Sequence, residues 1–194
     1  MSYLDRILDP GTDRESWQVA RRPVIGASDA ANFAKLESVP RYILAKLRPD
    51  FAGNAYTRSG HEWEPRILDW FGVPQNTALI HAEDEKGFAS TPDGIEQLPN
   101  GDLVLSQVKV FHDTIHTKIS PAHRRQMWWE QYTVGASVTK YMWVELVDGV
   151  PRRLEPHIVL FERDDLEIQK LLRIARPVLN GVLAARAYEK ELTA

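Results

Sequence analysis

The segment from Leu103 to Val110 is rich in Leu and Val and has polar residues only from Ser106 onward, a pattern that predicts a β-strand. Successive side chains of a β-strand point to opposite faces, so this segment divides into two sets of side chains. One face carries Leu103, Leu105, Gln107 and Lys109, and the other carries Val104, Ser106, Val108 and Val110. The first face turns from apolar to polar along the strand, which predicts a central strand whose end opens into a pocket.

The dipeptide Asn100-Gly101 precedes this strand and predicts a β-hairpin with the segment that begins after Asp93. Both central positions of the favoured two-residue turn need positive φ, which Asn and Gly tolerate. Pairing would bring Asp93 close to Gln107 and Lys109. A carboxylate, an amide oxygen and an ammonium group suit a hard cation and its bound water. The same residues also fit an ordinary turn beside a solvated strand end, so the local pattern leaves both interpretations open.

Helical spacing and turn signals predict the other elements. Short strands are expected at residues 77–82, 87–91, 140–147 and 152–164. Helices are expected over residues 13–22, 28–36, 38–47, 55–71, 121–135 and 166–192, the last disturbed at Pro177. Residues 1–12 lack periodicity, so we expect an N-terminal arm followed by a single domain over residues 13–194. This mixture of elements predicts the α/β class.

Glu64 lies on the apolar face of the helix predicted over residues 55–71. The same face carries Gly60, Ile67, Leu68 and Phe71. A carboxylate on a mostly apolar face must form an ion pair, bind a metal or lie at the edge of the core. Of these outcomes, an ion pair at the core edge is the commonest.

Composition narrows the range of functions. The chain has 194 residues, of which 43% are hydrophobic, enough for one domain with a substantial core. No apolar run approaches the length of a membrane span and no basic-then-apolar leader follows Met1, so we expect no membrane association and a cytoplasmic location. The absence of cysteine excludes disulfides, thiolate zinc sites and cysteine-bound iron-sulfur clusters. The formal net charge is -3, so binding to nucleic acid would depend on local basic patches or bound cations.

Two sequence elements resemble those of a known nuclease superfamily. The residues TPDGI (91–95) and LSQVK (105–109) are similar to the Asp and Glu-x-Lys elements of the PD-(D/E)XK nucleases, more narrowly the YqaJ-like viral recombinases typified by phage lambda exonuclease. The similarity is collinear over roughly residues 15–185. It implies a restriction-endonuclease-like core, an α/β fold with a small mixed β-sheet flanked by α-helices. Gln107 stands where this family has its second acidic residue.

The N-terminal part of the chain carries a further element of this resemblance. The W-x3-R-x3-I-x2-S element of the family is matched by Trp17, Arg21, Ile25 and Ser28. The resemblance implies that Arg21 and Ser28 bind the 5′-phosphate end of DNA. From the residues alone, Ser28 fits an ordinary helix cap, since capping serines greatly outnumber phosphate-binding ones.

Two later elements also match. Gly60 and Glu64 have the spacing of the family's G-x3-E element, which implies that Glu64 approaches the metal pocket. Gln126 matches the glutamine that opens the family's Q-x-Q helix, which implies that it positions water or phosphate. The second glutamine of that element is Trp128 here. The basic residues that precede this helix position, Arg124 and Arg125, are expected to form a DNA-facing edge.

The resemblance implies hydrolysis of phosphodiester bonds in linear double-stranded DNA, in the 5′ to 3′ direction, during phage-type recombination. Mg²⁺ is the implied cofactor, and Mn²⁺ is expected to substitute for it. The implied ligands are Asp93, the Val108 carbonyl and the Gln107 amide oxygen. Lys109 would activate water, and Glu64 would assist at the edge of the metal. The implied partners are double-stranded DNA ends, a single-strand annealing protein and further copies of the chain in a ring-shaped homotrimer.

Gln107 leaves three hypotheses open. The protein is an active enzyme with a Q-x-K element, a catalytically weakened DNA-binding relative, or an engineered variant that traps substrate. The question matters because an amide in place of a carboxylate removes one negative charge from a Mg²⁺ site. Outside the enzyme class, the same fold could serve a DNA-end-binding or partner-binding protein without catalysis.

Overall fold

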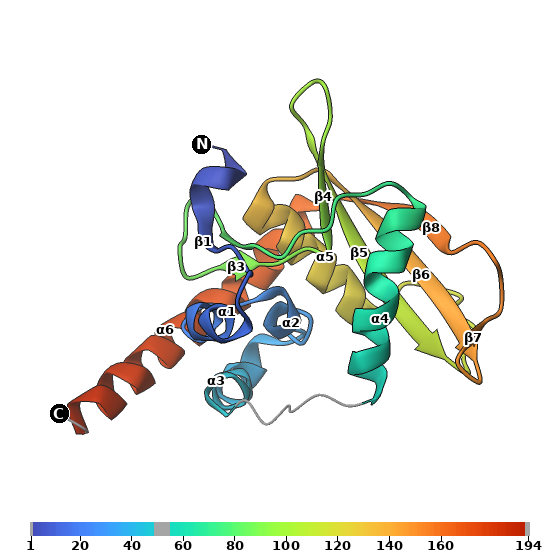
Figure 1. The fold of residues 1–194 in the computed structure, drawn as a ribbon. Coiled ribbons are helices and arrows are strands. Elements are labelled where there is room, and N and C mark those ends of the chain that lie inside the picture. The colour runs from blue at the N-terminus through green and yellow to red at the C-terminus, as the bar shows by residue number, and fades with distance from the viewer. Residues whose placement is uncertain (1, 49–54, 193–194) are drawn as a thin grey trace.

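The structure, a computed structural model, describes residues 2–48 and 55–192. In this part of the chain the strands form two sheets, surrounded by helices (Figure 1). The smaller sheet has the strand order β1-β2-β3 and consists of β1 (Ile7–Asp9), β2 (Leu79–His81) and β3 (Ala89–Ser90). The larger sheet consists of β4 (Gly94–Gln97), β5 (Leu103–His112), β6 (Val138–Val147), β7 (Val150–Pro151) and β8 (His157–Glu162).

The larger sheet is mixed, and β5 and β6 are its central strands. β5 pairs antiparallel with β4 but parallel with β6, in a register that places Gln107 opposite Tyr141. Parallel neighbours need a crossover connection, and here α5 (Pro121–Val134) supplies it. β7 and β8 pair antiparallel with β6. The strands predicted at residues 77–82, 87–91, 140–147 and 152–164 are confirmed in outline, with shorter bounds at most ends.

The remaining helices are two short 3₁₀ turns and five α-helices within the described residues. The 3₁₀ turns are η1 (Tyr3–Arg6) and η2 (Leu36–Ser38). The α-helices are α1 (Arg14–Arg21), α2 (Ala27–Ala30), α3 (Val39–Leu47), α4 (Ala55–Trp70) and α6 (Asp165–Leu192). Pro177 lies inside α6 without ending it. Among the described residues, no helix combines the length and the apolar character needed to cross a bilayer.

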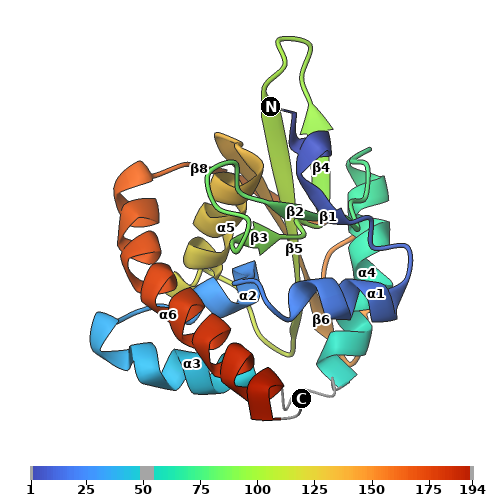
Figure 2. The same cartoon turned by 90° about the vertical axis from the view of Figure 1, so that its left-hand side faces the viewer.

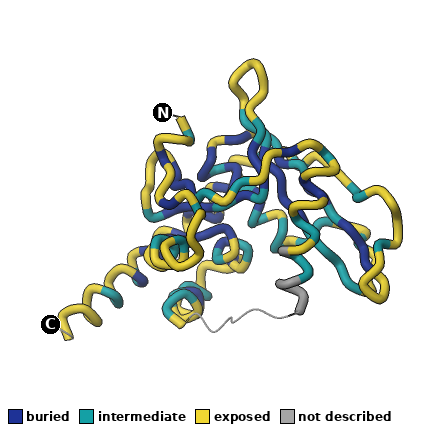
Figure 3. The backbone as a smooth tube through the Cα atoms, in the orientation of Figure 1, coloured by how far each residue is buried: buried dark blue, intermediate teal, exposed yellow. Residues whose placement is uncertain are grey.

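α4 and α5 cover opposite faces of β5. Val108 of β5 packs with Ile67 and Leu68 of α4, whereas Leu105 packs with Val134 at the end of α5. Even-numbered and odd-numbered side chains of one strand point to opposite sides, so the two helices lie on different faces. The largest apolar cluster lies beyond α5, where α6 runs across α5 and α3 (Figure 2). Burial is concentrated along β5, β6 and α5, and the β4–β5 turn is exposed (Figure 3).

The segment predicted as an N-terminal arm is part of the fold from Tyr3 to Asp9. β1 pairs with β2, and the side chain of Arg6 is only 4% exposed. The Arg6 guanidinium donates hydrogen bonds to the carbonyls of His81, Thr133 and Val134, the last at 2.6 Å. Two of these carbonyls belong to the last turn of α5, where carbonyl groups have no hydrogen-bond donor within their own helix. A three-residue strand is too short to show periodicity, which explains why the sequence pattern missed it.

The hairpin turn differs from the predicted two-residue turn. The Gly101 N–H donates to the Leu98 carbonyl at 2.9 Å, so Pro99 and Asn100 occupy the central positions. Only Gly101, at φ +90°, has a positive φ in this turn. Pro99 explains the difference, because its ring holds φ near -65° and suits the first central position of a common turn.

The helix predicted to begin at Ser28 begins one residue earlier and is much shorter. Gly26 is the N-cap of α2, and its N–H donates to the Asp29 carboxylate at 2.8 Å. Ser28 therefore lies inside the first turn instead of capping it. The helix ends at Ala30, so the prediction that it extends to Leu36 is wrong.

Candidate active site

The site lies where β5 continues past the first residue of its antiparallel partner β4. β4 starts at Gly94, which pairs with Ser106, so from Gln107 onward no described strand pairs with that edge of β5. Asp93 takes the place of the missing partner. Its N–H donates to the Ser106 carbonyl at 3.1 Å, and its Oδ2 accepts the Val108 N–H at 2.6 Å. The hairpin therefore holds a carboxylate in the plane of the sheet at the open edge of its central strand.

A chain of hydrogen bonds extends from Asp93 to α5. Gln107 Nε2 donates to Asp93 Oδ2 at 2.5 Å, and Gln126 Nε2 donates to Gln107 Oε1 at 2.5 Å. Gln126 Nε2 also donates to Glu130 Oε1 at 3.0 Å. Lys109 Nζ donates to Gln126 Oε1 at 3.2 Å, so the ammonium joins the same group. Five polar side chains from a loop, a strand and a helix are thus connected.

The orientation of Gln107 differs from the expected one. The sequence suggested that its amide oxygen would be offered to a cation beside Asp93. In the structure the amide nitrogen faces Asp93, because the oxygen accepts the hydrogen bond from Gln126. The same nitrogen lies 3.4 Å from the Val108 carbonyl oxygen. Gln107 therefore binds Asp93 as a donor.

Glu64 approaches this group from α4. It is partly buried, and its Oε1 accepts a hydrogen bond from Gln75 Nε2 at 3.3 Å. Burial raises the pKa of Glu64, while Gln75 and the charge of Lys109 lower it. The influence of Lys109 places Glu64 within electrostatic reach of the β5 edge. Gln75 was not singled out from the sequence, where nothing distinguishes it from a surface loop residue.

Carboxyl groups are concentrated around Asp93. Burial, together with the charge of Glu64, raises the pKa of Asp93 to about 7, against the opposing effects of Lys109, the Val108 N–H and Gln107. Burial, together with the charge of Asp93, raises the pKa of Glu130 to about 8. One ammonium group thus faces three carboxyl groups. A bound cation would favour the ionised forms of these carboxyl groups.

The residues fit a hard divalent cation only if oxygens other than carboxylates take part. Within the described part of the chain, no three Asp, Glu, His or Cys side chains are close enough to hold a metal by themselves. Asp93 and Glu64 are two carboxyl groups that interact electrostatically, and a cation between them would stabilise their ionised forms. The Val108 carbonyl oxygen, next to Gln107 Nε2, is a further possible ligand. Carboxylate, carbonyl and amide oxygens with water are the ligands that Mg²⁺ accepts. The donor set therefore suits Mg²⁺, with Gln107 contributing an oxygen only if its amide turns over.

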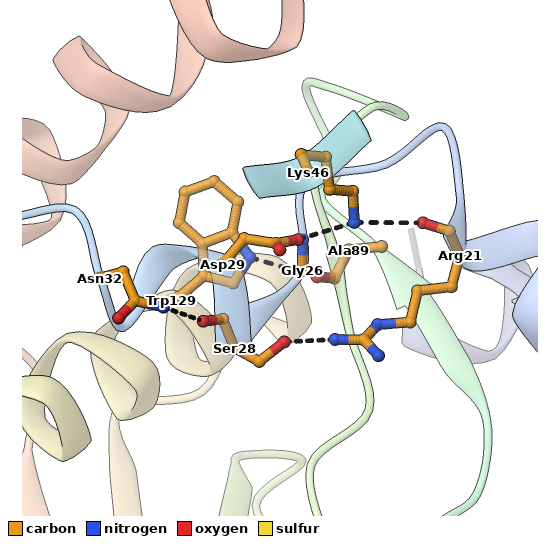
Figure 4. A network of polar contacts seen from close by, with 8 residues as sticks. All are labelled: Arg21, Gly26, Ser28, Asp29, Asn32, Lys46, Ala89 and Trp129. Carbon is orange, nitrogen blue, oxygen red and sulfur yellow. Dashed lines mark hydrogen bonds and ion pairs between the residues drawn. The ribbon is translucent and has the colours of Figure 1, made fainter. Parts of the chain in front are cut away.

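Arg21 and Ser28 meet at the start of α2 (Figure 4). Arg21 Nη2 donates to Ser28 Oγ, and the guanidinium lies 5.0 Å from the centre of the Trp17 ring. A second pair lies beside them, in which Lys46 Nζ is 2.8 Å from Asp29 Oδ2. Lys46 is thereby neutralised, whereas the guanidinium and hydroxyl of the first pair lie at the surface, where they could bind a phosphate.

The two basic residues at the start of α5 have separate environments. Arg124 is exposed, and Arg125 is partly buried and donates to the Ala31 carbonyl at 2.8 Å. Both line a cavity of about 310 Å³ together with Trp128 and Ile174, among other residues. None of the residues that hydrogen-bond around Asp93 lines this cavity. The structure therefore places them on the same helix as Gln126 but outside the group around Asp93.

The architecture is the predicted one, a small mixed sheet flanked by helices in an α/β nuclease-type fold. No profile of a known protein family matches the chain, and no curated protein sequence matches it. Solved structures do match. The alkaline exonuclease LHK-Exo from Laribacter hongkongensis, in complex with dAMP, has a TM-score of 0.69 and 22% identity, over 92% of this chain and 97% of that chain. A second structure of LHK-Exo has a TM-score of 0.68 at the same identity.

A phage-related exonuclease from Haemophilus somnus 129PT is also similar. Its TM-score is 0.60 at 14% identity, over 96% of this chain and 93% of that chain. At this level of identity the comparisons establish the fold, and they do so over nearly the whole length of each protein. The restriction-endonuclease-like fold predicted from the sequence is confirmed.

Proposed function

We propose that this chain is a Mg²⁺-dependent exonuclease that degrades linear double-stranded DNA from 5′ to 3′ in phage-type recombination, with Mn²⁺ able to replace Mg²⁺. The observation that carries the proposal is the group of Asp93, Gln107, Lys109 and Gln126, hydrogen-bonded around the open edge of the central strand. The fold is shared with exonucleases, one of which binds dAMP, a product of such a reaction. The pairing of an acid with an ammonium group matches the needs of phosphodiester hydrolysis.

Each residue has a distinct role in this proposal. Asp93 and Glu64, with the Val108 carbonyl, would hold the Mg²⁺, and Gln107 would orient the Asp93 carboxylate through its amide nitrogen and add an oxygen to the shell only if its amide turned over. When bound, the ion would polarise the phosphodiester and lower the pKa of a water molecule. Lys109, held by Gln126 Oε1, would orient that water and neutralise negative charge as it develops.

The DNA would be held outside this group. Arg21 and Ser28 would bind the 5′-phosphate through a guanidinium and a hydroxyl that already touch each other. Arg124 and Arg125 would border the path of the strand. Because the net charge is -3, such local contacts must supply the attraction to DNA, and a ring of three copies would enclose the duplex without a strongly basic surface. A single-strand annealing protein is the partner proposed to receive the remaining strand.

Digestion of linear duplex DNA labelled at each 5′ end tests the proposal. The protein should degrade this substrate with Mg²⁺ or Mn²⁺, and not with EDTA, and should leave closed circular duplex intact. Lys109→Ala should reduce the rate by about 100-fold or more while the DNA is still retained, because the ammonium acts on the reacting groups. Release of nucleotides from the 3′ ends only, or equal cleavage of circles, would contradict the assignment.

A second candidate follows from Gln107. Its neutral amide donates to Asp93 where a carboxylate would add charge to the metal site. On this basis the chain could be a DNA-end-binding protein with weak or no catalysis. It would then retain linear duplex without degrading it under either cation, and Gln107→Glu would create metal-dependent cleavage or strengthen it. Failure to retain DNA at moderate salt would leave a protein that acts through protein contacts.

A further inference from the structure

Glu130 is a buried carboxylate that the sequence did not single out. It lies in α5 one turn after Gln126, and its side chain is only 1% exposed. Its Oε1 accepts the hydrogen bond from Gln126, but its Oε2 has no hydrogen-bond partner among the described residues. Burying a carboxyl group with an unsatisfied oxygen is costly, and an apolar side chain of similar size would avoid this cost. Packing alone therefore gives no reason for an acid at this position.

The surroundings of Glu130 connect it to the site. Asp93 raises its pKa, and Lys109 and Gln126 lower it. The two hydrogens of Gln126 Nε2 are divided between Glu130 Oε1 and Gln107 Oε1. Glu130 Oε1 is the acceptor in this bond, so it fixes which end of the Gln126 amide points toward it. The Gln126 oxygen is then directed to Lys109 Nζ.

The same constraint passes to Gln107. Because Gln126 donates to the Gln107 oxygen, the Gln107 nitrogen must point to Asp93. Two amides thus lie between two carboxyl groups, and every bond in the chain has a consistent direction. Replacing either carboxyl would leave one amide free to turn over. Glu130, at the α5 end of this chain of hydrogen bonds, thus determines how both amides are oriented.

Glu130 also provides a carboxyl group where the hairpin has only one. The two hairpin residues that face each other, Asp93 and Gln107, contribute a single carboxylate. Glu130 adds a second carboxyl group, separated from Gln107 by the Gln126 amide. We propose that Glu130 is a positioning residue of the nuclease site, which orients the amides of Gln126 and Gln107 and, when a cation is bound, supplies the second carboxylate charge that Gln107 does not. This inference rests on the proposed function, since it assigns a role within that site.

Variants that move the carboxyl group from position 130 to position 107 test the inference. Four proteins are compared with the parent: Glu130→Gln, Gln107→Glu, the double variant that carries both changes, and Glu145→Gln as the control. Glu145 is a buried carboxylate, 7% exposed, in β6 and outside this hydrogen-bonded chain, where it accepts from the His116 N–H. Calorimetric titration of Mn²⁺ into each metal-free protein measures cation affinity directly. Thermal melting shows whether each variant is folded.

Glu130→Gln should weaken Mn²⁺ binding by about 10-fold or more, the size of effect that supporting residues of metal sites have. The double variant should recover most of that loss, because it returns one carboxylate to the site at a different position. Glu145→Gln should bind Mn²⁺ like the parent protein. Melting temperatures of Glu130→Gln should stay level or rise, since an amide is easier to bury than a carboxylate.

Two results would overturn the inference. One is unchanged Mn²⁺ affinity in Glu130→Gln. The other is an equal loss in Glu130→Gln and the double variant, accompanied by a lower melting temperature, which would make Glu130 a structural residue only. Both are independent of catalysis. If the parent protein binds Mn²⁺ but degrades no DNA, the proposed function fails while the affinities still decide the role of Glu130.

Discussion

Asp93 accepts two hydrogen bonds on the same oxygen, one from the main chain of Val108 and one from the Gln107 amide. These donors orient the carboxylate and partly offset the effect of its burial. The protonation state of Asp93 therefore depends on opposing effects. Burial and the neighbouring Glu64 favour the protonated form, and Lys109 favours the ionised form. Glu130 lies in the same balance at the other end of the amide chain.

The stability of the metal-free protein should decrease as pH rises between about 5 and about 8. Burial raises the pKa of Glu130 from its ordinary value of 4.5 to about 8, so in this range the folded state keeps a proton that the unfolded state releases. The contribution is present at low pH and is lost as pH approaches the folded-state pKa. The slope is at most about 1.4 kcal/mol per pH unit for one carboxyl group.

Chemical denaturation of the parent and of Glu130→Gln across this pH range, in EDTA, measures the effect. The variant should show a shallower decrease, with the remainder due to Asp93 and Glu64, whose pKa values are also raised. A stability that increases with pH in the parent would mean that Glu130 is better accommodated when ionised.

At the scale of elements, the position of Asp93 depends on close packing at the start of β4. A Cβ atom added to Gly94 would lie 2.7 Å from Val73 Cγ1 and 3.0 Å from the Pro74 carbonyl oxygen. The strand can therefore approach the segment after α4 only because residue 94 has no side chain. The close approach at Gly94 thereby holds the preceding residue, Asp93, against β5.

Gly94→Ala should lower the free energy of unfolding by about 1–3 kcal/mol, the usual cost of overpacking, and should also reduce nuclease activity by displacing Asp93. Gly60→Ala is the matched control, because an added Cβ there meets no atom of the described residues within 4 Å and α4 gains from the better helix former. Urea denaturation and the DNA digestion assay give the two readouts. Equal stability of the two variants would contradict the packing argument.

Several elements of the site were predictable and others were not. Strand alternation and the hairpin signal predicted that Asp93, Gln107 and Lys109 would be neighbours, because strand periodicity and turn chemistry are local properties. Glu130 was missed because a glutamate in a helix usually marks a solvated face. Its burial depends on α5 lying between the sheet and α6, which no local pattern of the chain expresses.

For the whole molecule, Arg6 joins parts of the chain that are far apart in sequence. Its guanidinium contacts the end of β2 and the last turn of α5, and its burial lowers its pKa. The N-terminal segment thereby holds the smaller sheet to the helix that carries Gln126 and Glu130. Long-range anchors of this type are invisible to sequence periodicity, which explains why the segment was expected to be an arm.

Arg6→Ala should lower the free energy of unfolding by about 3 kcal/mol, because three buried carbonyls lose their donor and a cavity opens. Arg14→Ala, at an exposed position of α1, is the control and should change stability by less than about 0.5 kcal/mol. Denaturant titration of both variants provides the measurement. A loss in Arg6→Ala no larger than in the control would show that the N-terminal segment is dispensable.

Because β4 begins only at Gly94, one edge of β5 has no described partner strand from Gln107 onward. A strand edge with unpaired N–H and carbonyl groups is a template on which a strand of another molecule can add, and β5 would present such an edge in the middle of the protein. Asp93 occupies the Val108 N–H at that point. The side chain assigned to the chemistry thus also fills a hydrogen-bonding position that an added strand would need, so we expect Asp93→Ala to self-associate more readily as well as to lose activity.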